Sequence, residues 1–169
     1  GNLVGKRAGM NPGLKPIAFG SHIDMVPDGG NYDGCVGSIS ALEVMDVLKE
    51  NNLKTNHPLE ILIFSNEEGA TYGSSFMAGH LHSEVLNNVS QSGLNLYDGI
   101  KAIGGDPDHI QNAVRQKGDL AAFLELHIEQ GAFLERDQIQ IGVVSGIVGI
   151  LQWDVTITGM ANHAGTTPM

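Results

Sequence analysis

Three short apolar segments of the chain each lead into side chains that can bind a metal or move a proton. The segments are Ile17–Gly20, Leu59–Phe64 and Ala121–Ile128. Continuous apolar runs of this length are typical of buried strands. Apolar residues spaced three apart predict a helix from about Gly37 to Asn51, between the first two segments. Strands that alternate with helices indicate an α/β domain with a mixed, largely parallel sheet and flanking helices.

Polar side chains follow these segments at the points where the strands are expected to end. His22 and Asp24 follow the first, Glu67 and Glu68 follow the second, and His127 lies near the end of the third. In such sheets, ligands bind beyond the carboxyl ends of the strands. Histidine and carboxylate together are ligands for zinc or manganese. Each group alone is more typical of an ordinary turn or surface, but together they predict a shared metal site.

The spacing within these groups suggests separate roles. Residues i and i+2 of a strand point the same way, so the Asp24 carboxylate is expected to support the ring of His22. Asp33 lies on a glycine-flanked turn, and its two oxygens can bridge two cations. Glu67 and Glu68 are adjacent and face opposite ways on an extended chain. One can therefore bind a metal while the other holds a proton.

Composition excludes some classes of partner. The formal net charge is −10, and so acidic a surface repels phosphate backbones, which argues against a nucleic-acid partner. No apolar stretch approaches the roughly 18 residues of a membrane helix, so no membrane partner is expected. A single cysteine and no visible signal peptide predict a reducing, cytoplasmic compartment.

The pattern changes toward the end of the chain. A short helix is predicted over Gly131–Arg136, followed by strands over Ile141–Val144 and Ile147–Thr158, the last rich in β-branched residues. We therefore predict a metal-binding domain over residues 1–146 and the start of a second, smaller domain over residues 147–169.

Five motifs, in this order, resemble those of the N-carbamoyl-amino-acid hydrolases and allantoate amidohydrolases, a family of dinuclear-metal amidohydrolases related to aminoacylases and carboxypeptidases. The motifs are Gly20-Ser21-His22-Ile23-Asp24, Gly29-Gly30-Asn31-Tyr32-Asp33-Gly34, Asn66-Glu67-Glu68-Gly69, Glu125-Leu126-His127-Ile128-Glu129-Gln130-Gly131 and Asn162-His163-Ala164-Gly165-Thr166-Thr167-Pro168-Met169. The resemblance runs nearly end to end. It implies a partial catalytic domain like that of zinc exopeptidases, then the start of a smaller α+β lid or dimerisation domain.

The resemblance also implies a set of metal ligands. His22 and His127 would hold one divalent ion, Asp33 would bridge two ions, and Glu68 would bind the second. The ions would be zinc or manganese, with cobalt possible. In relatives, a later part of the chain supplies a final histidine ligand, and an arginine and an asparagine that hold the substrate carboxylate. We therefore expect these 169 residues alone not to turn over substrate.

The remaining site residues take roles in hydrolysis by the same resemblance. Glu67 would be the general base that activates the bridging water, and Asp24 would orient His22. Gln130 would help to hold the substrate, and His163 of the smaller domain would stabilise the developing oxyanion, often across a homodimer. The substrate would be a small ureido compound, an N-carbamoyl-L-amino acid or allantoate, cleaved to release ammonia and carbon dioxide.

Two alternatives stay open. An aminoacylase or dipeptidase of the same superfamily would release an amine without ammonia. An inactive fragment would bind a metal or a partner without catalysis. The stretch from His127 to Gln130 favours the ureido-hydrolysing branch over peptidase relatives, which usually carry aspartate at the position of that histidine.

Overall fold

The computed structural model describes residues 1–90 and 92–168. Contacts divide the chain into two units, Gly1–Gln130 and Gly131–Met169, and each unit is described by itself. Met169 closes the fifth motif and the predicted second domain, and it lies outside the described residues. The domain boundary predicted after residue 146 stays a prediction.

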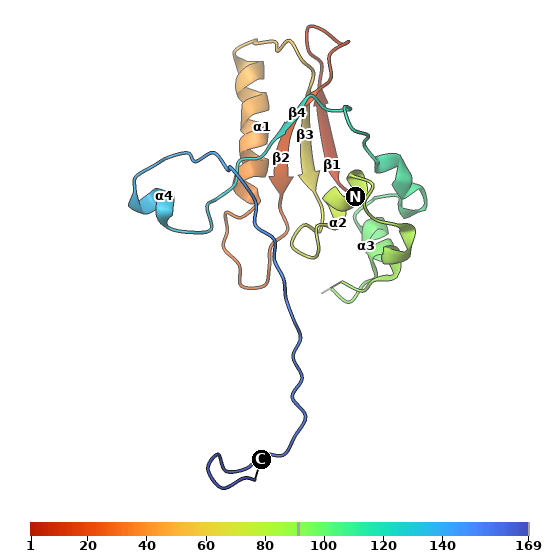
Figure 1. Cartoon of the computed structure of the whole chain (residues 1–169). Coiled ribbons are helices and arrows are strands. Elements are labelled where there is room, and N and C mark those ends of the chain that lie inside the picture. The colour runs from red at the N-terminus through yellow and green to blue at the C-terminus, as the bar shows by residue number, and fades with distance from the viewer. Residues whose placement is uncertain (91, 169) are drawn as a thin grey trace. The chain divides into compact units, whose positions relative to one another are not determined.

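A four-stranded sheet forms the centre of the first unit, with the strands in the order β1-β3-β2-β4 (Figure 1). Strand β2 (Ile17–His22) pairs in parallel with β3 (Leu59–Phe64) on one side and β4 (Ala122–Leu124) on the other. Strand β1 (Leu3–Arg7) pairs antiparallel with β3. The predicted α/β class with a mixed, largely parallel sheet is confirmed.

Helix α1 (Cys35–Glu50) connects β2 to β3 and packs on one face of the sheet. Its residue Ala41 is buried with Ile61 and Ile63 of β3. The helix ends at Glu50, where Asn52 takes a φ of 54° and the last carbonyls are bonded by the next backbone N–H groups. The predicted helix, Gly37 to Asn51, differs by two residues at its start and one at its end.

Short helices follow β3 and build the rest of the first unit. They are α2 (Tyr72–Met77), a 3-10 helix (Ser83–Asn87), α3 (Leu96–Ala102) and a second 3-10 helix (Pro107–Ala113). Met77 packs with Leu62 of β3 and Ala18 of β2, on the side chains that alternate with those facing α1. Phe76 forms a separate buried cluster with Leu86 and Leu96.

Two predictions for the later part of the chain are wrong in this structure. The third strand ends at Leu124 rather than Ile128, so His127 lies on irregular chain. Residues 141–144 and 147–158 form no strand, because no described residues pair with them and a lone strand is unstable in water. The short helix is confirmed as α4 (Phe133–Arg136).

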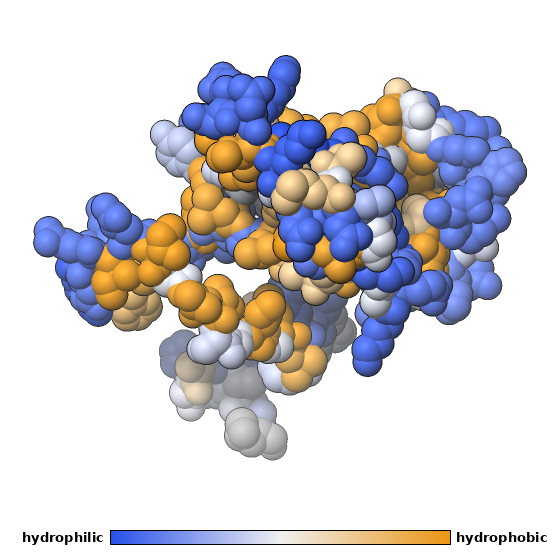
Figure 2. All heavy atoms as spheres, turned by 90° about the horizontal axis from the view of Figure 1, so that it is seen from above, coloured by the Kyte–Doolittle hydropathy of each residue, from blue (hydrophilic) through white to orange (hydrophobic). Residues whose placement is uncertain are grey.

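The surface carries many large apolar side chains, seen in orange in Figure 2. In the second unit they include Val143, which is 93% exposed, and Ile147, which is 94% exposed. None of the helices in the described part of the chain is both long and apolar enough to cross a membrane.

Candidate metal centre

The predicted ligands of the first unit come together at the carboxyl ends of β2 and β3. They form two overlapping groups, one of His22, Asp33 and His127 and one of His22, Glu67 and Glu68. Within each group, one potential ligand atom from every residue lies within 4.8 Å of the others. Side chains from four separate stretches of sequence thus meet at one edge of the sheet.

Both histidines present the Nε2 atom to this centre. The Nδ1 atom of His22 lies 2.9 Å from the backbone oxygen of Asp24, and that of His127 lies 2.8 Å from the backbone oxygen of Ile128. A carbonyl oxygen can only accept, so each Nδ1 donates to it and each Nε2 is left facing the centre. Histidine ligands of metals are held in this form by their second ring nitrogen.

The carboxylate of Asp33 faces both rings. Its Oδ1 atom lies 3.7 Å from Nε2 of His22 and 3.0 Å from Nε2 of His127. Oδ1 is buried and has no hydrogen-bond partner among the described residues. A cation bound between the three atoms would satisfy all of them, so the residues present fit a divalent metal.

Contrary to the prediction from the sequence, the carboxylate of Asp24 does not hold the ring of His22. Its carboxylate lies 3.8 Å from Nδ1 of His22, and the ring is held by its backbone oxygen instead. The carboxylate accepts the backbone N–H groups of Glu67, over 3.3 Å, and of Glu68, over 3.1 Å. Because β2 ends at His22, the alternation of a strand no longer applies at Asp24.

Glu67 lies beside His22 and has a raised pKa. One of its carboxylate oxygens lies 3.7 Å from Nε2 of His22. Partial burial raises the pKa of the Glu67 carboxyl, and the negative charges of Glu68, Asp24 and Glu125 raise it further against the opposing effect of His22. A carboxylate with a raised pKa is a stronger base, as general-base catalysis requires.

Gly34 allows the close packing around His22. Its φ is 62°, in the left-handed region, and a Cβ atom there would lie 2.4 Å from Nδ1 of His22. Glycine is therefore required between Asp33 and α1, both for its positive φ and for the lack of room for a Cβ atom.

Gln130 also contacts Asp33, because its Nε2 atom donates to Oδ2 of that residue over 2.6 Å. The substrate-binding role predicted for Gln130 stays a prediction.

His163 belongs to the second unit and is exposed there. Its Nδ1 atom accepts the backbone N–H of Gly165 over 3.0 Å. No contact of His163 with the described residues tests its role in stabilising the oxyanion, which stays a prediction.

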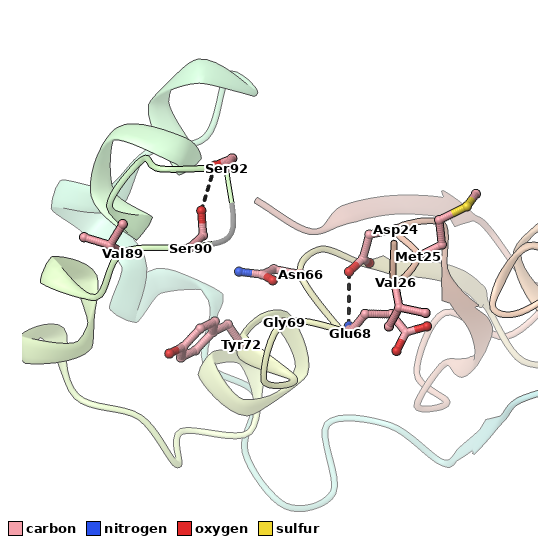
Figure 3. A pocket seen from close by; sticks show the side chains of 10 residues that line it. All are labelled: Asp24, Met25, Val26, Asn66, Glu68, Gly69, Tyr72, Val89, Ser90 and Ser92. Carbon is pink, nitrogen blue, oxygen red and sulfur yellow. Dashed lines mark hydrogen bonds between the residues drawn. The ribbon is translucent and has the colours of Figure 1, made fainter. Parts of the chain in front are cut away.

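A pocket of about 420 Å³ opens beside Glu68 (Figure 3). Val26, Tyr72 and Val89 give it apolar walls, and Asn66 adds an amide. Its volume is in the range of small-molecule sites. The pocket adjoins a candidate metal ligand, so a compound bound there lies next to the centre.

Two residues near the candidate ligands were not singled out from the sequence. The Oγ atom of Ser21 donates to Oε1 of Glu125 over 2.5 Å, and Glu125 contributes to the raised pKa of Glu67. Both stand inside the motifs, beside His22 and two residues before His127, and this position is the signal that could have marked them.

Known proteins resemble the chain along its whole length. It is 41% identical over 174 residues to the N-carbamoyl-L-amino acid amidohydrolase of Geobacillus stearothermophilus, covering 100% of this chain and 42% of that protein. It is 38% identical over 175 residues to the allantoate amidohydrolase of Escherichia coli strain K12, again covering 100% and 42%. The chain therefore spans less than half the length of these relatives.

A solved structure and a family model agree with these relatives. The structure of a hydantoinase/carbamoylase family amidase from Burkholderia ambifaria aligns with a TM-score of 0.68 and 32% identity, over 82% of this chain and 34% of that one. The model of peptidase family M20/M25/M40 matches residues 18–168, which include all the ligands described above. The chain belongs to peptidase family M20/M25/M40.

Proposed function

We propose that the complete protein hydrolyses the carbamoyl or ureido C–N bond of an N-carbamoyl-L-amino acid or of allantoate, releasing ammonia and carbon dioxide. One observation carries the proposal, namely that the Nε2 atoms of His22 and His127 both face the buried Oδ1 of Asp33, which has no hydrogen-bond partner among the described residues. The relatives named above support the choice of substrate class.

The centre is proposed to hold two divalent ions, zinc or manganese, with cobalt possible. His22, His127 and Asp33 would hold one ion, and Glu68 would contribute to the other with Asp33 as the bridge. Bound cations would polarise the poorly electrophilic ureido carbonyl and supply hydroxide near neutral pH.

Two side chains of the first unit have proposed roles during hydrolysis. Glu67 takes the proton of the attacking water and returns it to the leaving nitrogen, a role that its raised pKa supports. Asp24 holds the backbone of Glu67 and Glu68 in place while this happens.

Further roles are proposed from the resemblance of the motifs alone. Gln130 helps to hold the substrate, and His163 donates a hydrogen bond to the developing oxyanion. The complete protein is proposed to be a cytoplasmic homodimer, in which the smaller domain makes the subunit contact.

The test is ammonia release by the complete gene product, reconstituted in turn with manganese, zinc and cobalt. The substrate panel holds allantoate, several N-carbamoyl-L-amino acids, N-carbamoyl-β-alanine and one N-acetyl amino acid. We expect ammonia from at least one ureido compound and its loss in Glu67→Gln. As a matched control, Glu43→Gln makes the same change on the exposed surface of α1 and should keep full activity.

Two results would contradict the proposal. Amine release from the N-acetyl compound, without ammonia from any ureido compound, would assign the protein to the aminoacylase branch. Full activity of Glu67→Gln would remove Glu67 as the base, whatever the substrate.

A further inference from the structure

His127 lies on a segment that no strand or helix holds. Strand β4 ends at Leu124, and its last pair in the sheet joins that residue to Phe19 of β2. Residues 125–130 have no strand or helix assignment. The position of the His127 ring therefore depends on side-chain contacts and packing rather than on a backbone ladder.

The side chain of Glu125 anchors this segment to the end of β2. Its Oε1 atom accepts the hydroxyl of Ser21 over 2.5 Å, and Ser21 is fully buried, at 0% exposed. Short O–H···O⁻ hydrogen bonds to a carboxylate are among the strong ones in proteins. Because Ser21 precedes His22, the bond links the two histidine-bearing segments directly.

Close packing against α1 reinforces this anchor. A Cβ atom on Gly37 would lie 2.3 Å from the backbone oxygen of Leu126 and 2.8 Å from Cβ of Ser21. The first turn of α1, the end of β2 and the segment before His127 therefore meet without room for a methyl group. The segment cannot move toward the helix, and the bond to Ser21 opposes movement away from it.

We propose that Glu125, held by Ser21, is a positioning residue that fixes His127 at the metal centre. The two histidine rings lie 6.3 Å apart between centroids, and Nε2 of His127 lies 3.0 Å from Asp33. Loss of the anchor frees His127 but leaves His22 at the end of β2 and Asp33 in the turn before α1. The inference rests on one part of the proposed function, that the centre binds metal, and not on the hydrolysis reaction.

Metal affinity provides a readout that is independent of turnover. Apo protein made from the complete gene product is titrated with Co²⁺ and followed by its visible absorption, for wild type, Ser21→Ala, Glu125→Ala and Glu125→Gln. We expect both alanine variants to bind about 10- to 100-fold more weakly, as is typical when a group supporting a histidine ligand is lost. Glu125→Gln should stay within about threefold of wild type, because its amide oxygen accepts the same hydrogen bond.

Controls separate positioning from general damage. Glu43→Ala removes an exposed carboxylate from α1 and should bind Co²⁺ as wild type does. Circular dichroism of each apo variant checks that the fold is kept. Wild-type affinity in both folded alanine variants would overturn the proposal, and so would a glutamine variant as weak as the alanine variant. A wild-type protein that binds Co²⁺ but releases no ammonia would contradict the proposed function alone.

Discussion

The carboxylate of Asp24 accepts the backbone N–H of Glu68 over 3.1 Å and so joins the end of β2 to the loop after β3. Its other oxygen accepts the N–H of Glu67 over 3.3 Å. The backbone oxygen of the same residue holds the ring of His22. One aspartate thus contacts two candidate metal ligands, a histidine and a carboxylate, and the proposed base.

Asp24→Ala should therefore loosen the loop after β3 as well as weaken metal binding. Hydrogen bonds to a charged acceptor contribute about 1.5–3 kcal/mol each, and the Asp24 side chain is partly exposed, so we expect a loss of about 2 kcal/mol in the free energy of unfolding. Urea unfolding of the metal-free protein measures it. Asp24→Asn keeps one acceptor oxygen and should lose less of the free energy of unfolding. An equal loss in both variants would mean that the charge of Asp24, and not its hydrogen bonds to the backbone, stabilises the loop.

Glu67→Gln should make the metal-free protein more stable at neutral pH. The pKa of Glu67 is raised by folding, so the folded state binds its proton more tightly than the unfolded state does. The resulting stability is fully present below the ordinary pKa of glutamate and is lost as the pH rises through the raised value. The neutral glutamine avoids this loss, so the variant's advantage should shrink as the pH falls from 7 toward 4.

Thermal unfolding across this pH range, with a chelator present, tests the expectation. Glu43→Gln is the matched control, since its side chain is exposed on α1 and should give no such pH-dependent difference. A Glu67→Gln variant that parallels wild type at every pH would contradict the raised pKa.

Much of the fold follows from local pattern. Strand β3 is a continuous apolar run apart from Glu60, and its predicted and observed bounds agree. Strand β1 was not expected, because Leu3 and Val4 are its only large apolar residues and its order comes from pairing with β3. The segment 147–158 shows the reverse case, in which strand-like sequence without a described partner forms no strand.

The candidate centre was predictable in its members but not in its supporting contacts. His22, Glu68 and His127 stand out by residue type at the ends of apolar runs. The backbone role of Asp24 depends on where β2 ends, and the bond between Ser21 and Glu125 joins residues 104 positions apart. Contacts of this kind follow from tertiary packing, which periodicity along the sequence does not report.

Arg115→Met should destabilise the first unit through the buried Glu60. The Glu60 side chain is only 6% exposed, accepts Nη2 of Arg115 over 2.8 Å, and lies 3.5 Å from Nζ of Lys6. Removing one partner of a buried ion pair costs about 3–5 kcal/mol. Lys6 remains beside Glu60 and partly compensates its charge, so we expect a loss of about 3 kcal/mol in the free energy of unfolding, measured in urea. The double variant Glu60→Met/Arg115→Met should recover most of it. A double variant no more stable than Arg115→Met would show that lost packing, not the unpaired charge, is responsible.

Gly34→Ala tests whether the turn before α1 is shaped around the ring of His22. The substitution places a side chain at a φ of 62° and a methyl group 2.4 Å from Nδ1 of that ring, so it combines backbone strain with a collision. Gly118→Ala is the matched control, because its φ is 89° and no atom lies within 4 Å of the added methyl. Strain alone should cost the control about 1 kcal/mol in urea unfolding, whereas Gly34→Ala should cost about 3 kcal/mol.

Only Gly34→Ala should also weaken Co²⁺ binding, because the displaced ring can no longer direct Nε2 toward Asp33. Equal stability losses with unchanged Co²⁺ affinity in both variants would mean that the ring position does not depend on Gly34.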